Sequence, residues 1–270
     1  MSDSVYSVVG KCCEALKLDF SEEEFARLAA DNAFSPESLT AVSAVLEYLA
    51  EKKKQTTIQI LLRTSRLPQK NAKTFDNFDF NVLRGKDLEP LKNLRSLAAV
   101  YAHRNIAFIG PAGTGKTHLA QAFGYECCQQ GLKTYFIKAS ELRDKFTAAR
   151  RAGKEASTLT SLVRPSCLII EEVGHCEFDK ESTRLFFDLI DRRYNKEGAF
   201  NIVFTSNKSP ALWRENFSED DALLCSLDRI FDDAAVFNIR GESFRGKRLE
   251  TYSIQAGRMA VTRGSDQATI

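Results

Sequence analysis

The chain has 270 residues, of which 43% are hydrophobic and 27% charged, as is typical of a soluble globular protein with one large domain or two smaller ones. Its 38 Lys and Arg residues against 36 Asp and Glu residues leave a formal net charge of +2, which excludes a protein whose whole surface is basic for nucleic acid. We find no basic leader followed by an apolar core and no run of about 18 apolar residues. We therefore expect a cytoplasmic protein that does not enter a membrane.

The cysteines form no CxxC pair, and their odd number suits a reducing compartment better than a disulfide framework. We interpret them as small core or surface residues. They are Cys12, Cys13, Cys127, Cys128, Cys167, Cys176 and Cys225.

Residues 4–62 follow a helical pattern, with candidate N-caps at Ser21 and Ser35 and a proline directly after the second. Residues 1–50 carry nine acidic and three basic residues, whereas residues 51–74 carry one acidic and seven basic. Such a switch often marks a boundary. We predict a helical N-terminal domain at 1–68, a main domain at 69–258 and a flexible tail at 259–270.

The stretch RLPQKNAKTFDNFDF (66–80) has a proline and no clear periodicity. We expect a linker that becomes ordered where its aromatic side chains dock. Residues 87–103 then follow the pattern of one helix.

Short apolar runs alternate with helical stretches in the rest of the chain. They lie at 105–110, 133–139, 166–172, 199–207 and 234–239. Continuous apolar runs separated by helices are typical of parallel strands covered on both faces. We predict an α/β domain with a five-stranded parallel sheet.

The first of these runs leads into GPAGTGKT, which fits the P-loop pattern GxxxxGK[ST] and precedes a helical stretch. The glycines let backbone N–H groups surround a phosphate, and the helix N-terminus adds positive potential. We expect Lys116 to reach the β and γ phosphates of ATP and Thr117 to ligate Mg²⁺. The predicted nucleotide-binding residues are Gly110, Pro111, Ala112, Gly113, Thr114, Gly115, Lys116, Thr117 and His118. A chance glycine-rich turn is the alternative.

Two adjacent carboxylates, Glu171 and Glu172, end the apolar run CLIIEE. In P-loop enzymes, a strand beside the P-loop strand carries an acidic residue to Mg²⁺, and some classes add a Glu that polarises the attacking water. We expect Glu171 to face the metal and Glu172 the water. Glu171 stands where Asp is usual, so Mg²⁺ placement can shift and hydrolysis can slow while ATP binding persists. Two solvated carboxylates at a strand end are the alternative.

Polar residues also close the next strand, where FTSN places Ser206 and Asn207 at the carboxyl edge of the sheet. An amide there can sense the γ-phosphate or orient water, although a strand that simply runs into a polar turn gives the same pattern. Arg229 precedes the last strand and Arg240 follows it, and either can act as an arginine finger in a neighbouring subunit.

Taken together, RLPQKNAKTFDNFDF, GPAGTGKTHLA, LIIEEVG, LFFDLIDRRYNKEG, FTSN and LDRIFDDAAVFNIRGESFR resemble the IstB family of AAA+ ATPases over about residues 40–255. These are transposition helper proteins encoded beside an insertion-sequence transposase, and they are close to the DnaC-type helicase loaders. The resemblance implies an AAA+ fold with a short or absent C-terminal lid.

By matching motif, the resemblance makes Lys116 and Thr117 Walker A and the two glutamates Walker B. Asn207 would be sensor 1, Arg229 the arginine finger and Arg240 a possible second sensor. The resemblance also implies homo-oligomers with ATP between subunits, assembled on DNA.

A basic stretch at 141–154 follows the second predicted strand, in a region that faces DNA in related initiators and loaders. Its candidate DNA-binding residues are Arg143, Lys145, Arg150, Arg151 and Lys154. Such side chains neutralise phosphates without reading sequence, so we expect largely nonspecific binding with duplex DNA favoured. A solvated helix face is the alternative, and the basic residues of 52–73 are a second candidate surface.

The leading hypothesis is an ATP-hydrolysing AAA+ protein that assembles on DNA and assists a transposase. A replicative helicase loader and a nonhydrolysing ATP-gated DNA-binding module are the alternatives. A small-molecule kinase is disfavoured, because the sequence shows no Arg-rich phosphate lid and FTSN would have no role.

Overall fold

The computed structural model describes residues 4–83, 88–218, 228–241 and 243. The predicted tail at 259–270, the expected short or absent C-terminal lid and Cys225 lie outside these residues. The other six cysteines are free thiols, five of them buried, as predicted. No helix among the described residues is both long and apolar enough to cross a membrane.

The N-terminal region is a small helical unit built from α1 (Val5–Leu16), α2 (Glu22–Asp31) and the start of α3 (Pro36–Thr64). Both predicted N-caps are confirmed. Ser21 forms a full capping box with Glu24, and the hydroxyl of Ser35 accepts a hydrogen bond from the Ser38 amide. A small apolar cluster around Val9, Cys13 and Phe25 holds the unit together.

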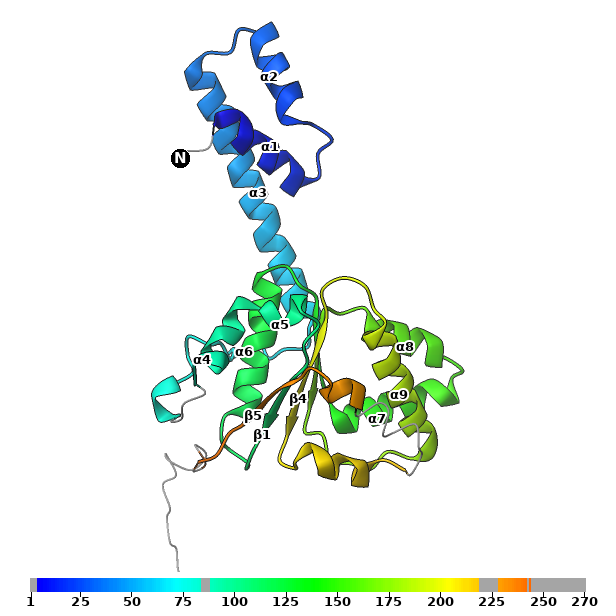
Figure 1. The fold of residues 1–270 in the computed structure, drawn as a ribbon. Coiled ribbons are helices and arrows are strands. Elements are labelled where there is room, and N and C mark those ends of the chain that lie inside the picture. The colour runs from blue at the N-terminus through cyan, green and yellow to red at the C-terminus, as the bar shows by residue number, and fades with distance from the viewer. Residues whose placement is uncertain (1–3, 84–87, 219–227, 242, 244–270) are drawn as a thin grey trace, which may run out of the picture.

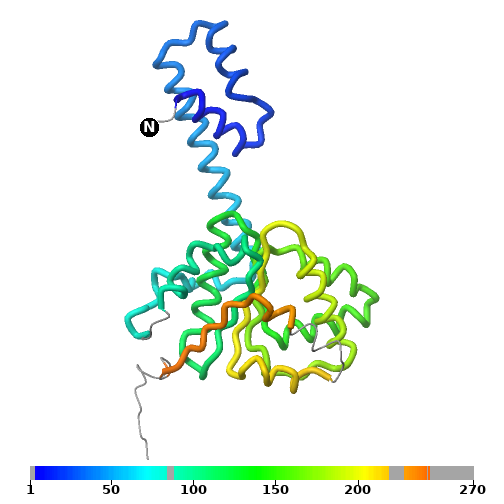
Figure 2. Tube along the Cα trace, in the orientation of Figure 1, coloured from blue at the N-terminus to red at the C-terminus, as the bar shows by residue number. Residues whose placement is uncertain are grey.

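Helix α3 connects this unit to the rest of the protein. Its 29 residues make it about 44 Å long, and Figure 1 shows the N-terminal helices standing off the main domain on it. Ile58 and Leu62, near its C-terminal end, are buried in the core of the main domain. Figure 2 traces the chain from α3 into the cyan segment that precedes the sheet.

The single helix predicted at 87–103 is wrong. The structure has three short pieces instead: α4 (Leu88–Lys92), the 3-10 helix η2 (Asn93–Ser96) and α5 (Ala98–Tyr101), preceded by a 3-10 turn η1 (Phe80–Val82). Leu91, Leu94, Leu97 and Val100 are all buried. Their spacing of three is compatible with both α and 3-10 geometry, and Leu97 interrupts the helical path with a left-handed φ of 57°.

The main domain contains the predicted five-stranded parallel sheet. Its strands are β1 (Ile106–Ile109), β2 (Thr134–Lys138), β3 (Cys167–Glu171), β4 (Asn201–Ser206) and β5 (Ala235–Asn238), in the order β2-β3-β4-β1-β5. The expectation that the strand ending in the acidic pair lies beside the P-loop strand is wrong, because β4 pairs with both β1 and β3 and separates them. The chain order of the strands does not reveal this insertion.

Helices cover both faces of the sheet, and alternate strand residues pack against each layer. One core contains Ala107, Leu168 and Phe204 with residues of α7 (Ala139–Arg151), α8 (Glu155–Val163) and α9 (Lys180–Tyr194). The other contains Phe108 and Ile169 with residues of α6 (Lys116–Gln129), α4 and the end of α3. Figure 1 shows these two layers on either side of the strands. A 3-10 segment, η3 (Pro210–Asn216), follows β4.

Candidate functional site

The P-loop connects β1 to α6 at the carboxyl edge of the sheet, in the strand–loop–helix context that its motif requires. The amide of Gly110 donates a hydrogen bond to the Ser206 carbonyl over 3.1 Å. A Cβ on Gly110 would lie 2.0 Å from the Ile239 carbonyl oxygen, so a side chain does not fit there. Gly113 and Gly115 have φ values of 81° and 93°, which favour glycine.

The polar side chains of the loop fold back onto it. Lys116 is buried, and its Nζ donates to the Pro111 carbonyl over 2.6 Å. The hydroxyl of Thr114 donates to the same carbonyl over 2.9 Å. Because α6 begins at Lys116, the unpaired N–H groups of its first turn and its dipole favour an anion at this loop.

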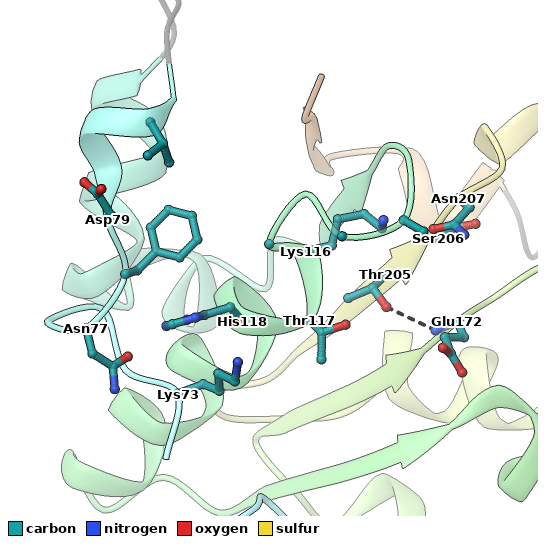
Figure 3. A pocket seen from close by; sticks show the side chains of 15 residues that line it. Lys73, Asn77, Asp79, Lys116, Thr117, His118, Glu172, Thr205, Ser206 and Asn207 are labelled. Carbon is teal, nitrogen blue, oxygen red and sulfur yellow. Dashed lines mark hydrogen bonds between the residues drawn. The ribbon is translucent and has the colours of Figure 1, made fainter. Parts of the chain in front are cut away.

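A cavity of about 380 Å³ lies beside the loop. Figure 3 shows residues 73–79 on one side of it and Glu172 and Asn207 on the other, with Lys116 and Thr117 between them. The lining residues are Lys73, Asn77, Phe78, Asp79, Val82, Ala112, Gly113, Gly115, Lys116, Thr117, His118, Glu172, Thr205, Ser206 and Asn207. The cavity therefore brings together most of the predicted nucleotide-binding residues, and Glu172 and Asn207 with them.

The segment 73–82 forms a wall of this cavity that the sequence interpretation did not assign to the site. Nε2 of His118 lies 2.9 Å from the Thr74 carbonyl, and the rings of His118 and Phe78 meet edge to face with centroids 5.0 Å apart. Burial, with some repulsion from Lys73, lowers the pKa of His118. Because a carbonyl oxygen can only accept, Nε2–H is the donor in this hydrogen bond. His118 thus holds residues 73–82 against the helix that follows the P-loop. In the sequence, the aromatic run TFDNFDF (74–80) was the signal that could have assigned this segment to the site.

The two glutamates take different positions. Glu171 is buried at the end of β3, and it is not among the residues that line the cavity. Glu172 has a left-handed φ of 61°, and its amide donates to the Thr205 hydroxyl over 3.1 Å (Figure 3). The half-exposed Glu172 carboxylate lies 3.5 Å from Nζ of Lys138, at the end of β2. Non-glycine residues adopt this conformation infrequently, and here it marks the turn that follows β3.

Ser206 fixes the end of β4 between these groups. Its hydroxyl donates to the Val173 carbonyl over 2.5 Å and accepts hydrogen bonds from the Trp213 indole and the Lys208 amide. Since β4 lies between β1 and β3, the exposed Asn207 that follows it stands between the P-loop and the glutamates. The buried Trp213, through its indole hydrogen bond to Ser206, anchors this loop.

The oxygen donors around the cavity fit a magnesium ion that arrives with a nucleotide. Among the described residues, no group of three or more His, Cys, Asp or Glu side chains is arranged to hold a metal ion. Mg²⁺ is commonly bound by one or two protein oxygens together with substrate phosphates. The hydroxyl of Thr117 lines the cavity and is a donor of that kind. The carboxylate of Glu171, buried at the end of β3 outside the cavity lining, is the second candidate.

The predicted DNA-binding residues lie on α7 and just after it. Arg143 pairs with Asp144 at 2.8 Å, and Arg150 pairs with Asp179 at 2.7 Å. Arg151 and Lys154 are exposed, and Lys145 is half-buried. Two of the five cations are therefore partly neutralised by carboxylates of the same chain.

Neither of the late arginines lines the P-loop cavity. Arg240 is exposed just after β5. Arg229 lines a second cavity of about 370 Å³. Ala235, the first residue of β5, pairs with Ile106, the first residue of β1, so Arg229 lies towards the opposite edge of the sheet from the P-loop.

Comparisons with known proteins agree with this architecture. Residues 14–251 match the family described as IstB-like ATP binding protein. The chain is 38% identical over 208 residues to an insertion sequence IS5376 ATP-binding protein from Geobacillus stearothermophilus, covering 76% of this chain and 81% of that protein. It is 34% identical over 193 residues to an insertion sequence IS21 ATP-binding protein from Pseudomonas aeruginosa, covering 72% and 71%.

Among solved structures, the DnaC helicase loader matches with a TM-score of 0.52 and 19% identity, over 63% of this chain and 97% of that one. AMPPCP-bound DnaA from Aquifex aeolicus matches with a TM-score of 0.51 and 20% identity, over 64% and 51%. At these identities the likeness shows the fold alone, a parallel α/β sheet with a P-loop. The chain belongs to the family of IstB-like ATP-binding proteins.

Proposed function

We propose that the protein binds and hydrolyses ATP, assembles on DNA and assists a transposase. The observation that carries this proposal is that one cavity is lined by the P-loop residues Lys116 and Thr117 together with Glu172 and Asn207. A phosphate-binding loop that faces a carboxylate and an amide is suited to phosphoanhydride hydrolysis, in which the protein positions water and stabilises charge.

In this proposal each side chain has its own role. The P-loop amides and Lys116 bind the β and γ phosphates, and Asn207 senses the γ-phosphate or orients water. Glu172 accepts a proton from the attacking water. Mg²⁺, held by Thr117 and Glu171 with the phosphates, would neutralise their charge, and the longer side chain of Glu171 in place of Asp slows this site without preventing ATP binding.

We propose that Arg229 acts on the ATP of a neighbouring subunit in a homo-oligomer. The four residues of β1 span about 13 Å, and Arg229 lies towards the amino edge of that strand while the P-loop follows its carboxyl edge. An arginine so placed cannot serve its own P-loop, and it suits a site completed by the next subunit.

We assign DNA contact to α7 and the residues just after it, where Arg151 and Lys154 are exposed. Cations of this kind bind phosphates rather than bases, so binding is largely nonspecific and weakens with salt. A transposase is the proposed partner, because the two relatives named above belong to insertion sequences. The division into a helical domain at 1–68 and an ATPase domain at 69–258 is also part of the proposal.

The test is ATP hydrolysis with and without duplex DNA, by the wild type, Lys116→Ala and Glu172→Gln, with assembly size followed in parallel. We expect DNA-stimulated turnover that both substitutions abolish, with larger assemblies accumulating in Glu172→Gln. Wild-type turnover no higher than that of Glu172→Gln would contradict hydrolysis. It would support the alternative function, a nonhydrolysing ATP-gated DNA-binding module. Stimulation by a replicative helicase in place of a transposase would favour the loader.

A further inference from the structure

Arg229 is held by two side chains of the neighbouring helix α9. It forms an ion pair with Asp191, and its guanidinium lies over the ring of Tyr194, 5.7 Å from the centroid. Asp191 and Tyr194 are three residues apart and so lie on the same side of the helix. The side chains of Arg229 and Asp191 are 43% and 46% exposed, so this contact lies at the surface, where a neighbouring subunit can reach it.

The backbone around Arg229 is anchored in the core. Ile230 is 1% exposed, and its carbonyl accepts a hydrogen bond from the Asn105 side chain over 3.0 Å. The ring of Phe231 lies 5.3 Å from that of Trp213. The backbone at Arg229 is therefore fixed by the core. The direction of its long side chain depends on other contacts.

The direction of that side chain matters, because Arg has many rotamers and other acids lie nearby. Asp232 and Asp233 line the same cavity as Arg229. Asp233 is paired with Arg104 at 3.1 Å. A guanidinium has five N–H donors in a planar fork, so pairing with Asp191 leaves donors for phosphate oxygens.

We propose that Asp191 and Tyr194 are positioning residues for Arg229, which they hold extended towards the ATP of the neighbouring subunit. This inference rests on the proposed function, in which Arg229 acts across the subunit interface. Helix α9 is a rigid support for it, since Phe186, Leu189 and Ile190 are buried in the core. Because an arginine finger is worth about 10³ to 10⁵ in rate, loss of its orientation lowers kcat rather than ATP binding.

The experiment mixes two full-length variants and measures DNA-stimulated ATP hydrolysis. Arg229→Ala subunits keep the P-loop and lack the finger, whereas Lys116→Ala subunits keep the finger and lack a working P-loop. Each variant alone is expected to be inactive. Mixing them restores turnover, because Lys116→Ala subunits supply fingers to the intact sites of their neighbours.

The substitution Asp191→Asn is then added to one partner at a time. Added to the Lys116→Ala subunit, it removes the support of the working finger and lowers the restored kcat about tenfold, with KM unchanged. Added to the Arg229→Ala subunit, whose finger is already absent, it has no effect. Tyr194→Leu behaves in the same way with a smaller loss, and Asp191→Glu recovers part of the rate.

Asp188→Asn is the matched control, since Asp188 lies one turn earlier on α9 and pairs with Arg192 of the same helix rather than with Arg229. Equal loss whichever partner carries Asp191→Asn would mean a general structural effect and overturn the inference. No loss in either mixture, or a gain, would overturn it too. If Arg229→Ala alone stays active, or the first mixture restores nothing, the proposed role of Arg229 itself fails.

Discussion

Replacing the buried Arg193 by Met is expected to destabilise the main domain by about 3–5 kcal/mol. Arg193 is 1% exposed, and burial lowers its pKa to about 10, so it remains a cation at neutral pH. Its guanidinium donates to the carbonyls of Leu162, Val163, Pro165, Ser166 and Asn201 over 2.6–3.3 Å.

The estimate balances two opposing effects. Methionine removes the Arg193 donors, although the Ser166 carbonyl keeps the Asn201 amide at 2.8 Å and the Pro165 carbonyl keeps Nζ of Lys196 at 3.5 Å. Each buried carbonyl that is left unsatisfied costs about 1–3 kcal/mol. The substitution also removes the cost of burying a charge, which is several kcal/mol. The carbonyls join the end of α8 to the starts of β3 and β4, so the loss falls on the elements that position Glu172 and Asn207.

Urea unfolding followed by tryptophan fluorescence measures this effect, because Trp213 is the single tryptophan and is buried in the main domain. The matched control is Arg192→Met, at the preceding position of α9. Arg192 is exposed and pairs with Asp188, so its loss should cost less than about 1 kcal/mol. An Arg193→Met variant within 1 kcal/mol of Arg192→Met would refute the reasoning.

Three further predictions concern the walls of the cavity. The pKa of His118 is lowered on folding, so its stabilising contribution is complete above its unfolded pKa of about 6.5 and declines as the pH falls below it. In thermal melts, lowering the pH from 7.5 to 5.5 should therefore reduce the melting temperature less in His118→Gln than in the wild type. The control His175→Gln, at an exposed histidine, should behave like the wild type. Phe78→Ala, which removes a ring from the cavity wall, should weaken ATP binding about tenfold (~1.4 kcal/mol) in a titration, and an unchanged affinity would exclude Phe78 from the site. Ser206→Ala should cost about 1–3 kcal/mol in urea unfolding, since three hydrogen bonds meet at its hydroxyl, and a neutral result would show that they contribute nothing net.

Features that depend on neighbours in the chain were predictable from the sequence. The five strands, the caps at Ser21 and Ser35 and the P-loop are encoded by short patterns of apolar, capping and glycine residues. The family resemblance was predictable for the same reason, because its motifs are short and keep their order. The prediction of one helix at 87–103 was wrong because apolar residues at every third position fit more than one helical geometry. The packing of Leu97 into the core determines which geometry forms.

Only the tertiary structure decided which of these pieces meet. The insertion of β4 between β1 and β3 depends on pairing between strands far apart in the chain, and it places Asn207 between the P-loop and Glu172. The docking of residues 73–82 on His118 and the pairing of Arg229 with Asp191 likewise join distant segments. The sequence by itself therefore determined the fold class, the P-loop and the carboxylates. The shape of the site came from long-range packing, in which contact energy rather than local propensity selects the partners.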